Sequence, residues 1–235
     1  MPHDASAAAG VLGRTYRAYL FDLDGTLVDS APDINSALNV ALAAAALPPV
    51  DERLTRHWIG HGARVVLEQA FIHHGAAARL ANEPEMARLL RIFLHHYSRH
   101  IADASGPYPG VTDALRELAD RGARLAVVTN KLAGLSNQLL EAVGLDRYFG
   151  AVVCGDSLPQ RKPDPAPALL ACRLLDVAPH EALFVGDSTT DVETARNAGC
   201  LVVCVRDGYN HGIAPEALGA DALVDSLLEL VGRAY

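Results

Sequence analysis

Short hydrophobic runs alternate with amphipathic segments through the second half of the chain. The apolar runs predict buried strands at residues 124–129, 151–155, 182–186 and 201–205. Apolar residues at helical spacing predict helices that end near residues 121 and 143, and helices over 164–175 and 189–197. Repeated strand–helix units whose strands are apolar throughout are typical of parallel sheets covered by helices. The pattern therefore predicts an α/β fold with a doubly wound parallel, Rossmann-like sheet.

A long helical segment interrupts this alternation after the first expected strand. Between residues 31 and 105 the chain carries only helical signals, including an alanine- and leucine-rich stretch over 33–47. The glycines and prolines of 106–110 then break the chain. We therefore predict an α-helical cap over 31–105, inserted into a core that is formed by residues 15–30 and 106–235.

The first 14 residues fit neither part of this arrangement. Residues 1–14 are alanine-rich and lack the basic start and apolar stretch of a signal peptide, so we predict a mobile tail. Elsewhere, the longest apolar runs fall well short of the roughly 18 residues that a membrane-spanning helix needs. The sequence therefore predicts no membrane segment.

Composition narrows the class of protein further. Half of the 235 residues are hydrophobic and a fifth are charged, which excludes a disordered chain. The formal net charge of −8 argues against nucleic acid or an anionic membrane as the partner. We expect a soluble, cytoplasmic enzyme with a small-molecule substrate. Nothing in the sequence indicates its oligomeric state.

Two aspartates lie where the first hydrophobic strand breaks into a glycine turn. Asp22 and Asp24 are separated by one residue, so a strand would direct both side chains to the same face. In open α/β sheets this carboxyl end of a strand is where ligands bind. Two adjacent carboxylates repel each other, so such a pair favours a bound cation or a shared proton. One of them can act as a nucleophile while the other transfers a proton.

Three later clusters of polar residues also follow predicted strands. They are Thr129 with Asn130, Lys162 within the stretch RKPDP, and Asp187 with Asp191. Because parallel strands end at one edge of a sheet, we expect all four clusters to meet there. Carboxylates suit magnesium, while a lysine and neutral donors stabilise phosphoryl oxygens. The sequence therefore predicts a magnesium-assisted phosphoryl-transfer site.

These four stretches resemble, in order and spacing, the motifs of the haloacid-dehalogenase-like hydrolase superfamily. The stretches are LFDLDGTLVDS at 20–30, LAVVTN at 125–130, RKPDP at 161–165 and ALFVGDSTTD at 182–191, and the resemblance runs from about Arg17 to the C-terminus. The segments GDSLPQRKPDPAP at 155–167 and DGYNHG at 207–212 look like the phosphoglycolate phosphatase branch. Relatives that act on other phosphomonoesters share parts of these two segments.

The resemblance implies a mechanism with assigned residues. Asp22 would attack phosphorus to form an aspartyl-phosphate, and Asp24 would protonate the leaving group and then activate water. Mg²⁺ would be held by Asp22, the backbone carbonyl of Asp24, and Asp187. Thr129, Asn130 and Lys162 would bind phosphoryl oxygens, with Asp191 and Thr26 in support. By resemblance alone, the preferred substrate would be 2-phosphoglycolate, which yields glycolate and phosphate.

The cap is expected to select the substrate, because the core motifs account only for the phosphate. The segment IGHGAR at 59–64 has glycines that permit close approach of backbone to a ligand. Arg64 could grip a carboxylate in bidentate fashion. The alternative is that Arg64 is a solvated surface residue.

Several other functions remain to be weighed. A haloacid dehalogenase does not need Asp24, and a phosphonate hydrolase would need a cap lysine, which residues 31–107 lack. A phosphomutase shares Asp22 and Asp24, so the motifs leave it open. A phosphatase for a sugar phosphate such as N-acetylmuramate 6-phosphate is the nearest alternative. A non-enzymatic interaction protein with this fold would have no reason to retain all four polar clusters.

Overall fold

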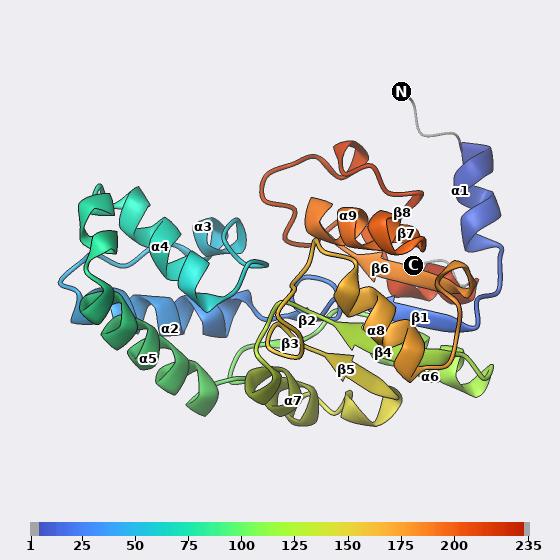
Figure 1. The fold of residues 1–235 in the computed structure, drawn as a ribbon, viewed down its shortest axis with the longest axis horizontal. Coiled ribbons are helices and arrows are strands. Elements are labelled where there is room, and N and C mark those ends of the chain that lie inside the picture. Colours follow the sequence, from blue (N-terminus) through green and yellow to red (C-terminus); the bar gives the residue numbers. More distant parts are fainter. Residues whose placement is uncertain (1–4, 233–235) are drawn as a thin grey trace.

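The computed structural model describes residues 5–232 and confirms the predicted fold class (Figure 1). Six strands form one sheet in the order β5-β4-β1-β6-β7-β8, and every neighbouring pair is parallel. The strands are β1 (Ala18–Phe21), β4 (Arg124–Val128), β5 (Ala151–Val153), β6 (Ala182–Gly186), β7 (Leu201–Val205) and β8 (Ala222–Val224). The chain starts at the centre of the sheet and builds outward in both directions, so β1 lies between β4 and β6.

Helices cover both faces of the sheet and form two separate hydrophobic cores. One face, which includes Phe21 and Val127, packs with α6 (Val111–Asp120), α7 (Ala133–Ala142) and the 3₁₀ segment η5 (Leu227–Val231). The other face, which includes Leu20 and Val128, packs with α8 (Ala166–Leu174) and α9 (Thr189–Ala198). Because successive strand residues point to opposite faces, a strand buried on both sides must be apolar throughout. None of the described helices is long and apolar enough to cross a membrane.

A group of helices, which we call the helical insertion, lies to one side of this sheet (Figure 1). The chain leaves the core at β2 (Val28–Asp29) and returns at β3 (Gly106–Pro107), which pairs antiparallel with β2. Between them lie α2 (Ala31–Ala44), α3 (Glu52–Arg56), α4 (Ala63–His73), η1 (Ala77–Ala81) and α5 (Glu83–Arg99). The buried face of α5 carries Met86, Leu89, Phe93 and Tyr97 at helical spacing, and α5 packs mainly against α2. The exact domain boundaries stay a prediction.

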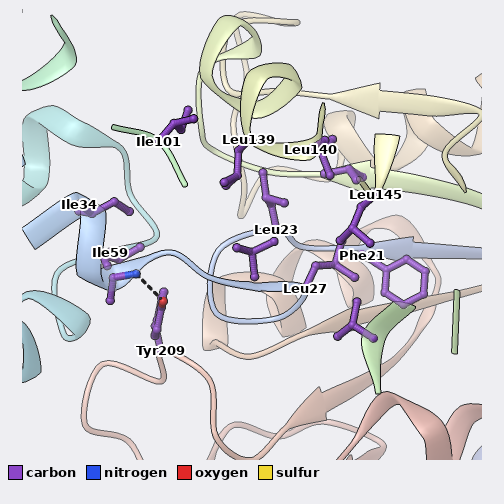
Figure 2. Packing of buried hydrophobic residues seen from close by; sticks show 14 of the residues in the cluster. Phe21, Leu23, Leu27, Ile34, Ile59, Ile101, Leu139, Leu140, Leu145 and Tyr209 are labelled. Atoms are coloured by element: carbon purple, nitrogen blue, oxygen red, sulfur yellow. Dashed lines mark hydrogen bonds between the residues drawn. The ribbon is translucent and has the colours of Figure 1, made fainter. Parts of the chain in front are cut away.

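A tyrosine in the core loop after β7 forms hydrogen bonds with the first residues of this insertion. The Tyr209 hydroxyl accepts the backbone N–H groups of Ser30 at 2.8 Å and Ala31 at 2.9 Å. It donates in turn to Oδ1 of Asp29 at 2.7 Å. Figure 2 shows the Tyr209 ring beside Ile34 and Ile59, with a dashed line ending on its hydroxyl. The first turn of α2 is therefore tied to the core at one point.

The two ends of the chain differ from the sequence expectation. Residues Ala5–Leu12 form helix α1, which contacts β8, where the sequence predicted only a mobile tail. Alanine is the strongest helix former, and Val11 and Leu12 pack against the core, which together account for the helix. Whether this segment moves stays a prediction, and residues 1–4 lie outside the described part. Strand β8 was not predicted, because three residues carry too short a pattern.

Candidate active site

The carboxyl edge of the sheet gathers the four polar clusters. Asp22 follows β1, Thr129 follows β4, Lys162 lies between β5 and α8, and Asp187 follows β6. The backbone fixes these positions, since Asp22 N donates to Val185 O at 2.9 Å and continues the ladder between β1 and β6. Eight sequence-predicted residues are buried together at this edge: Asp22, Asp24, Thr26, Thr129, Asn130, Lys162, Asp187 and Asp191.

Lys162 lies between the first and last clusters. Its Nζ is 2.7 Å from Oδ1 of Asp22 and 2.7 Å from Oδ1 of Asp191. The Asp22 contact is an ion pair without hydrogen-bond geometry, and no other described group donates to that buried oxygen. Burial raises the pKa of Asp22 to about 7. The positive charge of Lys162 acts to lower this pKa, and the negative charge of Asp191 acts to raise it. Asp22 therefore lines the cavity as a buried carboxylate whose charge is compensated by Lys162.

Asp191 is engaged on both of its oxygens. Besides Lys162, it accepts the backbone N–H groups of Asp187 and Ser188 at 3.2 Å and the Ser188 hydroxyl at 2.7 Å. Burial acts against ionisation, but Lys162 and these hydrogen bonds hold the pKa of Asp191 below its usual range. A carboxylate with this many donors is suited to orient Lys162 rather than to bind a ligand of its own.

Asp187 is held by the loops around it. Thr26 donates its hydroxyl to Oδ1 at 3.1 Å, and the backbone N–H of Tyr209 donates to Oδ2. Gly25 permits this approach, since it has a φ of +87° and a Cβ on it would lie 2.3 Å from Asp187 Oδ2. Burial, with the charges of Asp191 and Asp22, raises the pKa of Asp187 well above its usual value.

These residues fit a divalent cation. One oxygen each of Asp22, Asp187 and Asp191 lies within 4.8 Å of the others, and all three residues are buried. Among the described residues, the three carboxylates are paired with one ammonium group, that of Lys162, so an excess of two negative charges remains when all are ionised. Hard oxygen ligands of this kind suit Mg²⁺. The assignment of Asp22 and Asp187, rather than Asp191, as the metal ligands stays a prediction.

In the second cluster, the Thr129 hydroxyl has a hydrogen left to donate, whereas the Asn130 amide is already hydrogen-bonded. Thr129 accepts the Lys131 N–H at 3.2 Å, and its hydroxyl hydrogen has no acceptor among the described residues. Asn130 donates to the carbonyls of Gly60 at 3.0 Å and Lys162 at 3.2 Å, and accepts the Lys162 N–H at 3.0 Å. In this arrangement Asn130 positions the Lys162 backbone, and its predicted contact with phosphoryl oxygens stays a prediction.

The sequence analysis missed a second buried lysine at the site. Lys131 Nζ lies 2.7 Å from Oδ1 of Asp24 and donates to the Tyr97 hydroxyl of α5 at 2.7 Å. The Ser30 hydroxyl donates to the same Asp24 oxygen at 2.5 Å. Although burial disfavours its charge, Asp24 and Tyr97 raise the pKa of Lys131 above its usual value. The available signal was that Lys131, the only other lysine, follows Thr129 and Asn130 directly.

A cavity of about 360 Å³ opens between the site and the helical insertion. Asp22, Asp24 and Lys131 line its floor, while the other walls are largely apolar, with Ile34, Leu90, Phe93 and Leu94 among them. Arg64 also lines it, but its guanidinium is paired with Glu68 and Glu83, each at 2.7 Å, and its side chain is 46% exposed. The predicted contact of Arg64 with substrate stays a prediction.

This fold, with four polar clusters at one edge of a parallel sheet, defines a class of hydrolase. Over residues 19–205 the chain matches the family described as Haloacid dehalogenase-like hydrolase, and it belongs to that family. It is 44% identical to a phosphoglycolate phosphatase of Mesorhizobium japonicum, over 92% of this chain and 96% of that protein. It is 38% identical to an N-acetylmuramic acid 6-phosphate phosphatase of Pseudomonas aeruginosa, over 92% and 93%.

The structural comparison agrees. The fold is similar to the crystal structure of a protein described as a predicted phosphoglycolate phosphatase from Haemophilus somnus 129PT, with a TM-score of 0.86. The two chains are 37% identical, and the match covers 92% of this chain and 97% of that one. The predicted family is confirmed.

Proposed function

We propose that the protein is a magnesium-dependent phosphatase that hydrolyses 2-phosphoglycolate to glycolate and phosphate. The observation that carries the hydrolytic part is the position of Asp22, a buried carboxylate that lines the cavity beside the Lys162 ammonium group and the carboxylates of Asp187 and Asp191. Membership of the hydrolase family supports the class of reaction. Similarity to phosphoglycolate phosphatases over nearly the full chain supports the substrate.

The reaction proceeds in two halves on the side chains of this chain. An Asp22 oxygen attacks phosphorus, the bond from phosphorus to the ester oxygen breaks, and Asp24 gives that oxygen a proton. Asp24 then takes a proton from a water molecule that attacks the aspartyl-phosphate, which frees phosphate and restores Asp22. Lys162 and the Thr129 hydroxyl stabilise the phosphoryl oxygens as their charge develops.

The metal and the helical insertion complete this scheme. Magnesium, when bound by Asp22 and Asp187 with the Asp24 carbonyl, supplies positive charge that offsets the carboxylates and phosphoryl oxygens. The apolar walls of the insertion exclude bulk water, which strengthens the charge interactions in the cavity.

A second candidate substrate is a larger sugar phosphate such as N-acetylmuramate 6-phosphate. The observation that favours it is the cavity, which at about 360 Å³ with apolar walls has more room than phosphoglycolate fills. The similarity to a phosphatase of that name supports it as well.

The test is turnover against a panel of phosphomonoesters, with and without magnesium. The panel contains 2-phosphoglycolate, N-acetylmuramate 6-phosphate, a hexose 6-phosphate and p-nitrophenyl phosphate. We expect the highest kcat/KM for 2-phosphoglycolate and no turnover in excess chelator. A higher kcat/KM for the sugar phosphates would show that the preferred substrate is a sugar phosphate, and the reaction would still be phosphomonoester hydrolysis. Transfer of the phosphoryl group to a second hydroxyl of the product would identify a phosphomutase instead.

A further inference from the structure

Lys131 places a buried positive charge at the floor of the cavity, on the leaving-group side. Its side chain is only 6% exposed, yet it lines the cavity together with Asp22 and Asp24. An ammonium group has three hydrogens to donate, and described residues accept two of them, at Asp24 Oδ1 and the Tyr97 hydroxyl. One hydrogen and part of the charge therefore remain for a ligand.

The two oxygens of Asp24 have different surroundings, so one can pair with Lys131 while the other transfers a proton. Lys131 and Ser30 both donate to Oδ1 of Asp24, and no described residue donates to Oδ2. Oδ2 is therefore the oxygen available to the ester oxygen of a substrate. An ester oxygen hydrogen-bonded to this carboxyl group would lie about 4–6 Å from Lys131 Nζ, since two hydrogen bonds of ordinary length separate them.

This separation matches the structure of phosphoglycolate. Its carboxylate is attached to the carbon that carries the ester oxygen, so the carboxylate reaches just beyond that oxygen. N-acetylmuramate 6-phosphate, in contrast, carries its carboxylate on the far side of the sugar ring from the phosphate. A cation next to the general acid therefore recognises a carboxylate only when the ester oxygen and the carboxylate share a carbon.

The other cations of the cavity are less suited to this role. Arg64 is already paired with Glu68 and Glu83 at the surface. Arg161 is exposed and donates through Nε to the carbonyl of Gly155 at 2.7 Å. Lys162 is not among the residues that line the cavity, and its ammonium group is paired with Asp22 and Asp191. Among the described residues that line the cavity, Lys131 alone is a buried cation with a hydrogen left to donate.

We infer that Lys131 is a specificity-determining residue that binds the carboxylate of the leaving group, an inference that rests on the proposed function. Lys131 selects 2-hydroxy acid phosphates over neutral phosphomonoesters of the same size. Tyr97, from α5, holds the ammonium group in place, so the insertion contributes to specificity by positioning a lysine of the core.

The experiment compares 2-phosphoglycolate with its neutral amide, 2-phosphoglycolamide, which has almost the same shape. kcat and KM are measured for both substrates with the wild type, Lys131→Met, Lys131→Arg and Arg64→Ala. We expect the wild type to prefer the acid by about ten- to a hundredfold in kcat/KM, the range for one charge-assisted contact. Lys131→Met should abolish this preference, chiefly through a higher KM for the acid, and Lys131→Arg should retain part of it.

Each other outcome has a definite meaning. Equal kcat/KM for acid and amide in the wild type overturns the inference without any variant, so it stays falsifiable even if Lys131→Met does not fold. An unchanged preference in Lys131→Met, with both substrates slowed equally, means that Lys131 only positions Asp24. Loss of the preference in Arg64→Ala but not in Lys131→Met moves the carboxylate contact to Arg64. A wild type that hydrolyses other phosphomonoesters but not 2-phosphoglycolate overturns the proposed substrate, and this inference with it.

Discussion

Lys162 Nζ and Asp191 Oδ1 lie 2.7 Å apart, and their side chains are 2% and 0% exposed. Lys162 comes from the loop before α8 and Asp191 from the first turn of α9, so the pair joins a loop to a helix at the sheet edge. Removing one partner from a buried ion pair leaves the other charge uncompensated, which is strongly unfavourable. The pair therefore determines where the ammonium group can lie relative to Asp22.

Asp191→Asn should lower kcat without removing the nucleophile. An asparagine can still accept a hydrogen bond from Ser188, but it supplies no charge to hold Lys162. We expect activity to fall by about 10–100-fold, the usual effect of losing a group that orients a catalytic side chain or a metal ligand. Steady-state kinetics with saturating magnesium measures this. Activity within a factor of two of the wild type would show that Lys162 needs no such support.

Asp22→Asn should reduce turnover to background. The variant keeps the shape of the side chain but cannot form an aspartyl-phosphate. Circular dichroism and the thermal midpoint control for folding, and trapping of radiolabelled phosphoenzyme in the wild type provides the positive comparison. A folded Asp22→Asn protein that retains a tenth of the wild-type rate would contradict the nucleophile assignment.

Asp24→Asn should affect substrates according to their leaving groups. A general acid or base contributes about 10²–10⁴-fold. p-Nitrophenolate needs little protonation when it departs, so phosphoenzyme formation should suffer less with p-nitrophenyl phosphate than with 2-phosphoglycolate. Burst kinetics separates that first step from hydrolysis of the intermediate. The same fold-reduction of the first step on both substrates would exclude Asp24 as the leaving-group acid.

The metal-free protein should lose stability as pH rises through neutrality. The pKa of Asp22 is raised to about 7 by burial, above the value of about 3.9 for an unfolded aspartate. Folding therefore favours the protonated form, and this contribution is fully present below about pH 4 and is lost as pH rises through about 7. In chelator, Asp22→Asn should melt above the wild type at pH 8, by at least about 2–4 °C, with a smaller difference at pH 5.

Thermal midpoints measured across this pH range check the prediction. Addition of magnesium should raise the midpoint of the wild type more than that of Asp22→Asn, because the variant lacks one ligand. Parallel pH profiles for the two proteins in chelator would mean that Asp22 does not titrate in this range.

Gly208→Ala should inactivate the enzyme by displacing Asp187. A Cβ at position 208 would lie 2.1 Å from the Cβ of Asp187, so the carboxylate must move. Gly134 in α7 is a matched control, because a Cβ there meets nothing within 4 Å. Gly134→Ala should leave activity unchanged and stabilise the fold by up to about 1 kcal/mol. Activity and the magnesium dependence of the thermal midpoint distinguish the two variants.

The hydrophobic pattern was sufficient to predict a parallel sheet and the meeting of its polar loops, but not its edge strand β8. β6 and β7 have the predicted bounds, since a strand buried on both faces is a continuous apolar run. The short strands β2 and β3 were missed, because two residues form no period. Their pairing became visible only in three dimensions.

The sequence was enough to predict which loops form the site, but not which side chains contact one another within it. Parallel strands bring Asp22 and Lys162 to the same edge of the sheet regardless of side-chain conformation. The contacts of Lys131 depend instead on the direction of one long side chain and on Tyr97, which reaches it from α5. Likewise, the ion pair of Arg64 in α4 with Glu83 in α5 depends on how these two helices meet. Sequence spacing within one element carries no information on such contacts.

The pairing of β2 with β3 has an evolutionary consequence. Val28 lies opposite Pro107 and Asp29 opposite Gly106, so the segment between them begins and ends at neighbouring points. A tight turn could join these two points and leave all six strands of the sheet intact. A segment attached in this way can be lengthened or exchanged by recombination without breaking a strand of the sheet. The apolar walls that the insertion contributes to the cavity are therefore heritable separately from the aspartates and Lys131 of the core.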